Sequence, residues 1–277
     1  MLPIKKIYID SRNRSSASIS STDFYIDLPV NINLEANTSF YLTDITIPVS
    51  FYTIESGRNN NVYFTKGDHH YHRRSIPEGN YNTITLNQAI VTAMNTAYPL
   101  TGGAHPTKFT ANPDFNNNKI GISNSVDQFQ ILTDAQALEF VMETPQFFDT
   151  SVSLPLNSIN AMIQNDTANI HSPTIPYISG YVDLYPIRNL YIISQTLSNY
   201  TSVSTNGEYG ILKKVPVSAS YNNMIYDNTV LGMDHLDCSN KTLSRIDFKV
   251  KDAYGNIVNL HGNHWSFSII FIKVNED

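Results

Sequence analysis

The densest group of side chains that could bind a metal ion is Asp68-His69-His70-Tyr71-His72. On a strand, His70 and His72 would share a face and could supply two ligands. A transition-metal site needs three or four ligands, and neither a cysteine pair nor a His-Glu-x-x-His helix occurs in the chain. We therefore predict an exposed polar hairpin or loop with no metal and no cofactor. The sequence leaves a pH-dependent or metal-binding role of His69, His70 and His72 open.

Asp234 and Asp237 are a second candidate, because two carboxylates are the groups that hydrolyse glycosides. Spacing alone is a weak indication, since solvated or capping Asp residues are far commoner. Phosphate-binding glycine loops and the G-x-S-x-G elbow do not occur in the sequence. We therefore predict that the protein is not an enzyme. Turnover abolished by Asp234→Ala would favour a glycoside-acting enzyme instead.

Cys238 is the single cysteine, so the chain cannot form an internal disulfide. A nucleophilic thiol needs a positive setting, which lowers its pKa. The neighbouring Asp234 and Asp237 make the local charge negative, although His235 lies three residues away. We expect Cys238 to be a buried structural thiol.

Leu100-Thr101-Gly102-Gly103-Ala104 follows Pro99 in an expected loop. Its Gly102-Gly103 pair resembles the cleavage signal read by adenovirus-type maturation proteases, and loops are where proteases reach a chain. A flexible glycine loop between a helix and a strand is the simpler interpretation. The intact mass of the chain in mature particles would decide between the two.

The composition is poor in charge. The chain has 277 residues, of which 15% are charged and 41% hydrophobic, against a typical charged fraction of ~25%. A surface of uncharged polar groups is easily desolvated, which favours a protein packed against neighbours. An AT-rich genome would also enrich Asn, Ile and Tyr, so both explanations stay open.

The net charge of -6 argues against a nucleic-acid-binding protein, which needs clustered Lys and Arg. We expect no specific nucleic-acid partner. The longest apolar run, Phe267–Ile272, is far shorter than the ~20 residues of a spanning helix, so we expect no membrane segment. A strand at the very start leaves no room for a signal peptide.

Hydrophobic alternation with a period of two dominates both ends of the chain and predicts half-buried strands. Phe24, Ile26 and Leu28 would share one face of a strand, and Ile246, Phe248 and Val250 one face of another. The phase slips within 39–53, which predicts a β-bulge near Thr43-Asp44. Asp252–Asn256 predicts a tight turn between two strands.

Helical patterns fall only in the middle of the chain. Thr85-Leu86-Asn87-Gln88 is a capping-box pattern, followed by an apolar stripe from Leu86 to Ala97. Thr133 opens a second helix, with Leu138, Val141 and Met142 as its apolar side. The fold class is therefore predicted as mainly β. We expect a small α+β module at 61–149 inserted into a β-sandwich formed by 1–60 and 150–277.

Six sequence blocks follow one another along the chain. They are Ile9–Arg14, Asp23–Pro29, Ser39–Tyr52, Ile76–Tyr81, Ile246–Asn256 and Trp265–Ser268. Together these blocks resemble the penton, or minor capsid, proteins of virophages and Polinton-type viruses. None is a catalytic signature, so the specificity comes from their number and their order along the chain. The resemblance is weaker between residues 145 and 240.

This resemblance implies a single jelly-roll capsid subunit that assembles as a homopentamer at icosahedral vertices. Its neighbours would be hexamers of the double-jelly-roll major capsid protein, and the inserted module would decorate the outer surface, where it could meet a host receptor. It also implies a location in the virion after synthesis in the cytoplasm of the infected cell. Arg12 and Arg14 become possible assembly contacts at a strand end.

A receptor- or carbohydrate-binding β-module of a viral fibre or spike is the alternative. Tyr-rich β-surfaces bind sugars, and this chain has 17 Tyr. A stable trimer or binding on a glycan array would favour that alternative.

Overall fold

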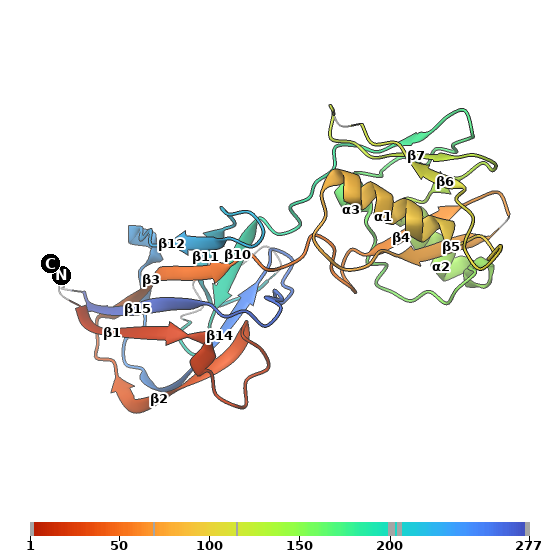
Figure 1. The fold of residues 1–277 in the computed structure, drawn as a ribbon. Coiled ribbons are helices and arrows are strands. Elements are labelled where there is room, and N and C mark those ends of the chain that lie inside the picture. The colour runs from red at the N-terminus through yellow and green to blue at the C-terminus, as the bar shows by residue number, and fades with distance from the viewer. Residues whose placement is uncertain (1–2, 69, 115, 199–202, 204–206, 275–277) are drawn as a thin grey trace. The chain divides into compact units, whose positions relative to one another are not determined.

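The computed structural model describes residues 3–68, 70–114, 116–198, 203 and 207–274 (Figure 1). The chain divides into two compact units. A terminal unit comprises Met1–Phe51 and Ile187–Asp277, and an inserted module comprises Tyr52–Pro186.

The terminal unit is built from strands of both chain ends. Two short 3₁₀ turns, Ser11–Asn13 and Gly232–Asp234, accompany them. The strands are β1 (Pro3–Asp10), β2 (Asp23–Asn33), β3 (Thr38–Pro48), β10 (Asn189–Ile193), β11 (Ile211–Pro216), β12 (Met224–Asp227), β13 (Leu236–Asp237), β14 (Thr242–Lys251) and β15 (Ser266–Lys273).

These strands form two antiparallel sheets. The first sheet has the order β1-β15-β3-β12, with β13 paired to the far part of β3, and the second has the order β11-β10-β14-β2. Setting β13 aside, the chain alternates between the sheets in the pattern of an eight-stranded jelly roll. The predicted fold class is confirmed: the protein is mainly β, a single jelly-roll β-sandwich with an inserted α+β module.

The inward faces of the two sheets meet in an aromatic cluster. The ring of Trp265 lies 4.7 Å from that of Phe267 and 5.9 Å from that of Phe24, centroid to centroid. Phe248 joins them from the second sheet, 5.5 Å from Phe24. The buried indole N–H of Trp265 donates to the carbonyl of Ser21 at 2.8 Å, so this polar atom has a hydrogen-bond partner. Truncating one of these phenylalanines to Ala would cost about 3–5 kcal/mol.

The predicted bulge in β3 is confirmed. Ser266 of β15 pairs with Thr46, whereas Ser268 pairs with Thr43, so β3 contains one extra residue at this point. Asp44 has a φ of 52°, in the left-handed region. The bulge keeps Leu42 before it and Ile45 after it on the buried face, despite the phase slip in the sequence.

Two buried charges hold the edges of the sandwich. Lys213 of β11 faces inward, with a side chain only 5% exposed, and its ammonium lies 3.3 Å from Asp234 and 3.8 Å from Asp227. It also donates to the carbonyl of Thr229. Removing one partner from a buried ion cluster costs about 3–5 kcal/mol, so Lys213 ties the second sheet to the chain around β12 of the first.

Asp247 lies on the face of β14 opposite to Ile246 and Phe248, as the alternation predicts, but it is not exposed to solvent there. Its carboxylate is buried because it accepts hydrogen bonds from the chain that follows β10. The donors are Thr196 N–H at 2.7 Å, Gln195 N–H at 3.0 Å and the Ser194 hydroxyl at 3.2 Å. Burial alone would raise the pKa of Asp247, but these hydrogen bonds outweigh it and lower the pKa.

The predicted Asp252–Asn256 turn is present. Asp252 N–H donates to the carbonyl of Asn256, and the Asp252 carboxylate accepts from Tyr254 N–H and Asn256 N–H. Gly255 has a φ of 87°, a conformation that glycine adopts without strain. Beyond the turn, the chain pairs with β14 through an isolated bridge between Lys251 and Ile257.

The inserted module contains two small sheets, with orders β5-β4-β8 and β6-β7-β9. In the sequence, α1 follows β5, and α2 and α3 lie between β8 and β9. A 3₁₀ turn, Pro145–Phe147, follows the second helix. The elements are β4 (Asn61–Thr65), β5 (Tyr71–Ser75), α1 (Thr83–Asn95), β6 (Phe109–Ala111), β7 (Gly121–Asn124), β8 (Gln130–Ile131), α2 (Asp134–Glu143), α3 (Asn160–Ile163) and β9 (Tyr177–Ile178).

Both predicted helices are present, with two corrections. The first helix is capped by Asn82, not by Thr85. Thr85 is the third residue of the helix, and it completes a capping box by accepting from Asn82 N–H. The second helix starts at the predicted cap, Thr133, but Leu138 and Met142 are exposed. Its packed side is instead formed by Ala137, Phe140 and Val141.

The module is wider in the structure than the expected 61–149. Residues 150–186 belong to it because Ile159, Met162 and Tyr177 pack into its core. The strand expected at 177–183 ends at Ile178, after which Gly180 N–H and Asp183 N–H donate to carbonyls of α3, those of Ile163 and Met162.

Each unit has its own hydrophobic core among the described residues. We therefore predict that a fragment of residues 52–186 folds alone, because burial of its own apolar side chains drives its folding. The fragment should unfold cooperatively in urea, and circular dichroism should show ordered aromatic side chains. A fragment with no cooperative transition would contradict this prediction.

Candidate functional site

In the histidine cluster, His72 is bound by two aspartates. His72 of β5 is buried, with a side chain only 3% exposed, which corrects the expected exposed hairpin. Its Nδ1 lies 2.7 Å from Asp149 Oδ2, and its Nε2 lies 3.1 Å from each carboxylate oxygen of Asp68. Only a doubly protonated ring donates through both nitrogens. His70 is exposed, and His69 lies outside the described residues.

The two carboxylates around His72 are also bound by cations. Asp149 accepts a bidentate contact from Arg74, at 2.5 and 3.1 Å. Asp68 is paired with Lys66, whose ammonium lies 4.8 Å from the centre of the Tyr98 ring. This network joins the β4–β5 hairpin to the segments after α1 and α2. Because every charge has a partner, its role is to hold the module together.

The shifts in pKa follow from these contacts. Burial alone would raise the pKa of Asp68, but the hydrogen bonds from Lys66 and His72 outweigh it and lower the pKa to about 2. Burial alone would also raise the pKa of Asp149, but the hydrogen bonds from Arg74 and His72 outweigh it and lower the pKa.

The candidate carboxylate pair is divided between two local networks. Asp234 accepts from Lys213 and from Leu231 N–H. Asp237 accepts from the hydroxyl and the backbone N–H of Ser239, so it caps the turn after β13. Both carboxylates have structural partners.

Cys238 is buried in the core of the terminal unit, and its Sγ lies 3.4 Å from the carbonyl oxygen of Thr38. Burial raises the pKa of the thiol to about 12, and the neighbouring Asp237 acts in the same direction. The thiol is therefore protonated at neutral pH.

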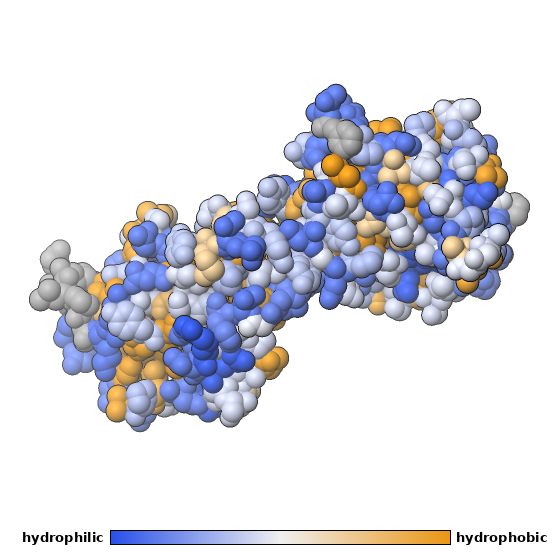
Figure 2. Space-filling view, in the orientation of Figure 1, coloured by the Kyte–Doolittle hydropathy of each residue, from blue (hydrophilic) through white to orange (hydrophobic). Residues whose placement is uncertain are grey.

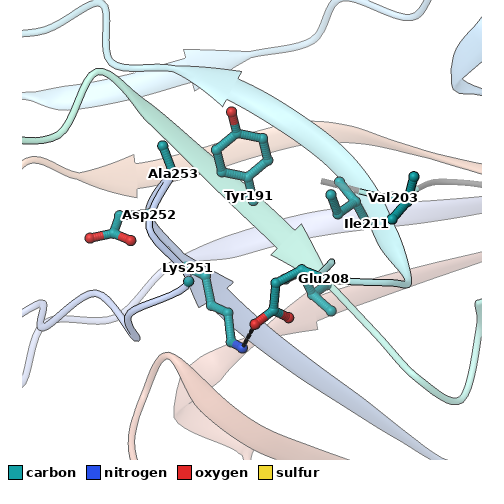
Figure 3. A pocket seen from close by; sticks show the side chains of 9 residues that line it. Tyr191, Val203, Glu208, Ile211, Lys251, Asp252 and Ala253 are labelled. Carbon is teal, nitrogen blue, oxygen red and sulfur yellow. Dashed lines mark hydrogen bonds and ion pairs between the residues drawn. The ribbon is translucent and has the colours of Figure 1, made fainter. Parts of the chain in front are cut away.

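A hollow of about 260 Å³ lies on the outer face of the second sheet. Figure 3 shows Tyr191 at one side of it, facing the ion pair in which Lys251 Nζ donates to Glu208 Oε1 at 2.6 Å. The carboxylate of Asp252, which caps the adjacent turn, lies at its edge. Because its charged groups already have partners, a sugar bound here would have to displace those contacts.

The two arginines near the end of β1 have partners within the chain. Arg12 makes a bidentate contact with Asp10, with Nη2 at 2.5 Å from Oδ2, yet its side chain is 69% exposed. Arg14 donates to the carbonyl of Ser11 at 3.0 Å. The guanidinium of Arg12 is thus held in one place while remaining accessible.

Gly102 and Gly103 form the exposed tip of a tight turn. Thr101 and Ala104 bond to each other through their backbones, and both glycines have a positive φ, 63° and 86°. Cleavage requires an extended chain, so a protease would first have to open this turn.

The outer faces of the two sheets differ in charge. On the second sheet, acidic and basic side chains alternate across strands and pair with each other, as in Asp27–Arg245, Asp23–Lys249 and Glu208–Lys251. The outer face of the first sheet has mostly uncharged side chains, and Lys6–Asp44 is an ion pair described there, which crosses from β1 over β15 to β3. Figure 2 shows hydrophobic side chains reaching the surface over β1 and β15. By strand register and burial, the aromatic, aliphatic and proline side chains on this outer face are Tyr8, Tyr41, Pro48, Met224, Tyr226 and Ile270.

We assign the candidate site to this outer face of the first sheet, because a charge-poor apolar face is easily desolvated on contact with another protein. The composition indicates a low overall charge, but it does not indicate that the charged side chains are concentrated away from the outer face of the first sheet. Alternation within β12 could have indicated the pair Met224 and Tyr226, but their exposure depends on β12 being an edge strand.

In the described part of the chain, His, Cys, Asp and Glu do not gather in threes as metal ligands. None of the described helices has the length and apolarity needed to cross a bilayer.

The strand order defines the class of the protein: a single jelly roll with an α+β module between its third and fourth strands. No family model and no curated protein sequence matches the chain. Among solved structures, the chain is similar to the crystal structure of the mavirus penton protein. That match covers 98% of this chain and 100% of that chain, with 11% sequence identity and a TM-score of 0.47.

The His72 network generates a prediction for Asp68→Asn. Because the folded-state pKa of Asp68, about 2, lies below its unfolded value of ~3.9, the carboxylate stabilises the fold at pH 7. We expect the variant to lose roughly 1–2 kcal/mol of unfolding free energy at pH 7. Urea unfolding measures this loss.

The difference between wild type and Asp68→Asn should shrink as the pH falls from about 4 towards 2, because the wild-type carboxylate becomes protonated. Asp166→Asn, at an exposed position of the same module, is the control and should change little. A difference that stays constant from pH 7 to pH 2 would contradict the role of the ionised carboxylate.

Proposed function

We propose that this protein is a structural subunit of a viral capsid and forms homopentameric pentons at icosahedral vertices. The observation that carries the proposal is the order of the strands, β1-β15-β3-β12 facing β11-β10-β14-β2. Jelly rolls of this kind recur in viral capsid proteins, lectins and cupins.

Two further features favour the capsid role among these classes. The interior of the jelly roll is filled by aromatic side chains such as Phe24, Phe248 and Trp265, whereas a cupin uses its interior for chemistry. Exposed apolar side chains such as Tyr8 and Tyr226 lie on the charge-poor outer face of the first sheet, which suits contacts between subunits. The sequence blocks that resemble penton proteins support the same role.

In this proposal the protein resides in the virion after synthesis in the cytoplasm of the infected cell. Its partners are further copies of itself and hexamers of the major capsid protein. The inserted module decorates the outer surface, where it can meet a host receptor. Its acidic character supports an exposed position, since the module has six Lys and Arg against eleven Asp and Glu.

Carbohydrate binding by a fibre or spike is the second candidate, and the hollow beside Tyr191 is the observation in its favour. Binding on a glycan array that is lost in Tyr191→Ala would support it. The capsid role is favoured because the ion pair between Lys251 and Glu208 already occupies the polar groups of that hollow.

In the capsid role, Arg12 and Arg14 contact a neighbouring subunit. We expect Arg12→Ala to weaken assembly with little effect on folding, because an exposed ion pair contributes little to stability. Light scattering should give five chains for the wild type, alone or with the major capsid protein, and fewer for the variant. Point substitution is preferable to deletion of residues 1–14, which would remove β1 and the buried Ile9.

Arg245→Ala is the matched control, since Arg245 also makes an exposed pair with an aspartate but lies on the second sheet. Equal loss of assembly in both variants would contradict a specific contact at Arg12. Absence of the wild-type chain from purified particles would contradict the capsid role itself.

A further inference from the structure

The first sheet ends in two edge strands with exposed aromatic side chains. Tyr8 on β1 is 76% exposed and Tyr226 on β12 is 74% exposed. Both point outward, because their neighbours Ile9 and Ile225 are buried in the core. An edge strand also presents backbone groups that have no partner within the sheet. The same sheet thus has an apolar side chain at each of its two margins.

The two margins differ in composition. We define the β1 margin as Lys5, Lys6 and Tyr8. The β12 margin is larger, and Met233 within it is 88% exposed. It consists of Met224, Tyr226, Asp227, Met233, Asp234 and Asp237.

The margins also differ in charge. At the β1 margin, Lys5 and Lys6 are both exposed, and Lys6 has a single carboxylate partner in Asp44. At the β12 margin, three aspartates face one lysine, Lys213, which is buried between Asp227 and Asp234. Asp237, on β13, is exposed. The β1 margin is therefore basic and the β12 margin is acidic.

The outer face of the second sheet lacks this character. Its exposed charges pair with each other, and the guanidinium of Arg245 lies 5.7 Å from the centre of the Tyr25 ring, which it covers. Charges that already have partners gain little from a further contact. Net charge of opposite sign and exposed apolar side chains occur together at the two margins of the first sheet: Lys5 and Lys6 outnumber Asp44 at one margin, and the aspartates outnumber Lys213 at the other.

We propose that the β12 margin of one copy packs against the β1 margin of the next copy. Opposite charge and exposed apolar groups make the two margins complementary to each other, while like charges oppose the pairing of a margin with itself. Two different patches on one subunit give a heterologous contact, which closes into a ring when the rotation between copies allows it. This inference rests on the proposed homopentamer and assigns its interface.

Cysteine cross-linking tests this arrangement, because the single native cysteine, Cys238, is buried. The double variant Tyr8→Cys/Tyr226→Cys carries one accessible thiol at each margin. Treated with a short flexible bis-maleimide, it should give a ladder of covalent oligomers on a denaturing gel. Each single variant treated alone should stay at the 31.1 kDa of one chain.

A mixture of the two single variants makes the test directional. Tyr8→Cys mixed with Tyr226→Cys should give covalent dimers and no longer species, because each chain has one thiol. The control is Tyr8→Cys/Tyr254→Cys, since Tyr254 is as exposed as Tyr226, at 74%, but lies in the Asp252–Asn256 turn. It should give no ladder.

Three results would overturn the proposal: no ladder from the double variant, an equal ladder from the control, or dimers from Tyr8→Cys alone, which would mean that like margins pair.

Particle purification separates this inference from the capsid role. If the wild-type chain enters particles but the double variant gives no cross-links, only the proposed contact between the margins is overturned. A ladder from a chain that never enters particles overturns the capsid role only.

Discussion

The terminal unit depends on the pairing of β15 with two strands from the other end of the chain. β15 lies between β1 and β3 in the first sheet, and β14 pairs with β2 in the second. These contacts bridge more than 200 residues of sequence, so the sandwich closes only when both chain ends meet. A long insertion between β3 and β10 is compatible with this pairing, because the entropic cost of loop closure grows only slowly with loop length. The module has its own hydrophobic core, built from its own apolar side chains.

Paired charges serve different purposes in the two units. In the module, His72 lies between Asp68 and Asp149, and Lys66 and Arg74 complete the set. In the jelly roll, Lys213 joins the two sheets, and the ladder on the outer face of the second sheet satisfies its own charges. The first sheet is left as the charge-poor face. Segregation of this kind allows a subunit to stay soluble through one face and to associate through another.

The composition agrees with this division of surfaces. A chain with few charged residues can still be soluble when its charges are concentrated where solvent remains, and its uncharged faces then cost little to desolvate. The proposed contact between the β1 and β12 margins makes use of this property. It places the aromatic side chains Tyr8 and Tyr226 at the centre of a contact, where such residues contribute most to binding.

The sequence by itself determined the features that depend on near neighbours. The alternation in β2 and β14, the bulge at Thr43-Asp44, the Asp252–Asn256 turn and the cap at Thr133 all follow from local periodicity and local hydrogen bonds. Tertiary structure alone decided which polar groups are buried. The buried His72, Lys213 and Asp247 bind partners that lie 77, 21 and 52 residues away in the sequence. It also decided that the module extends to residue 186 and that Tyr8 and Tyr226 lie on opposite margins of one sheet. Spacing along a chain does not specify which distant segments will pack together, and these features arise only from that packing.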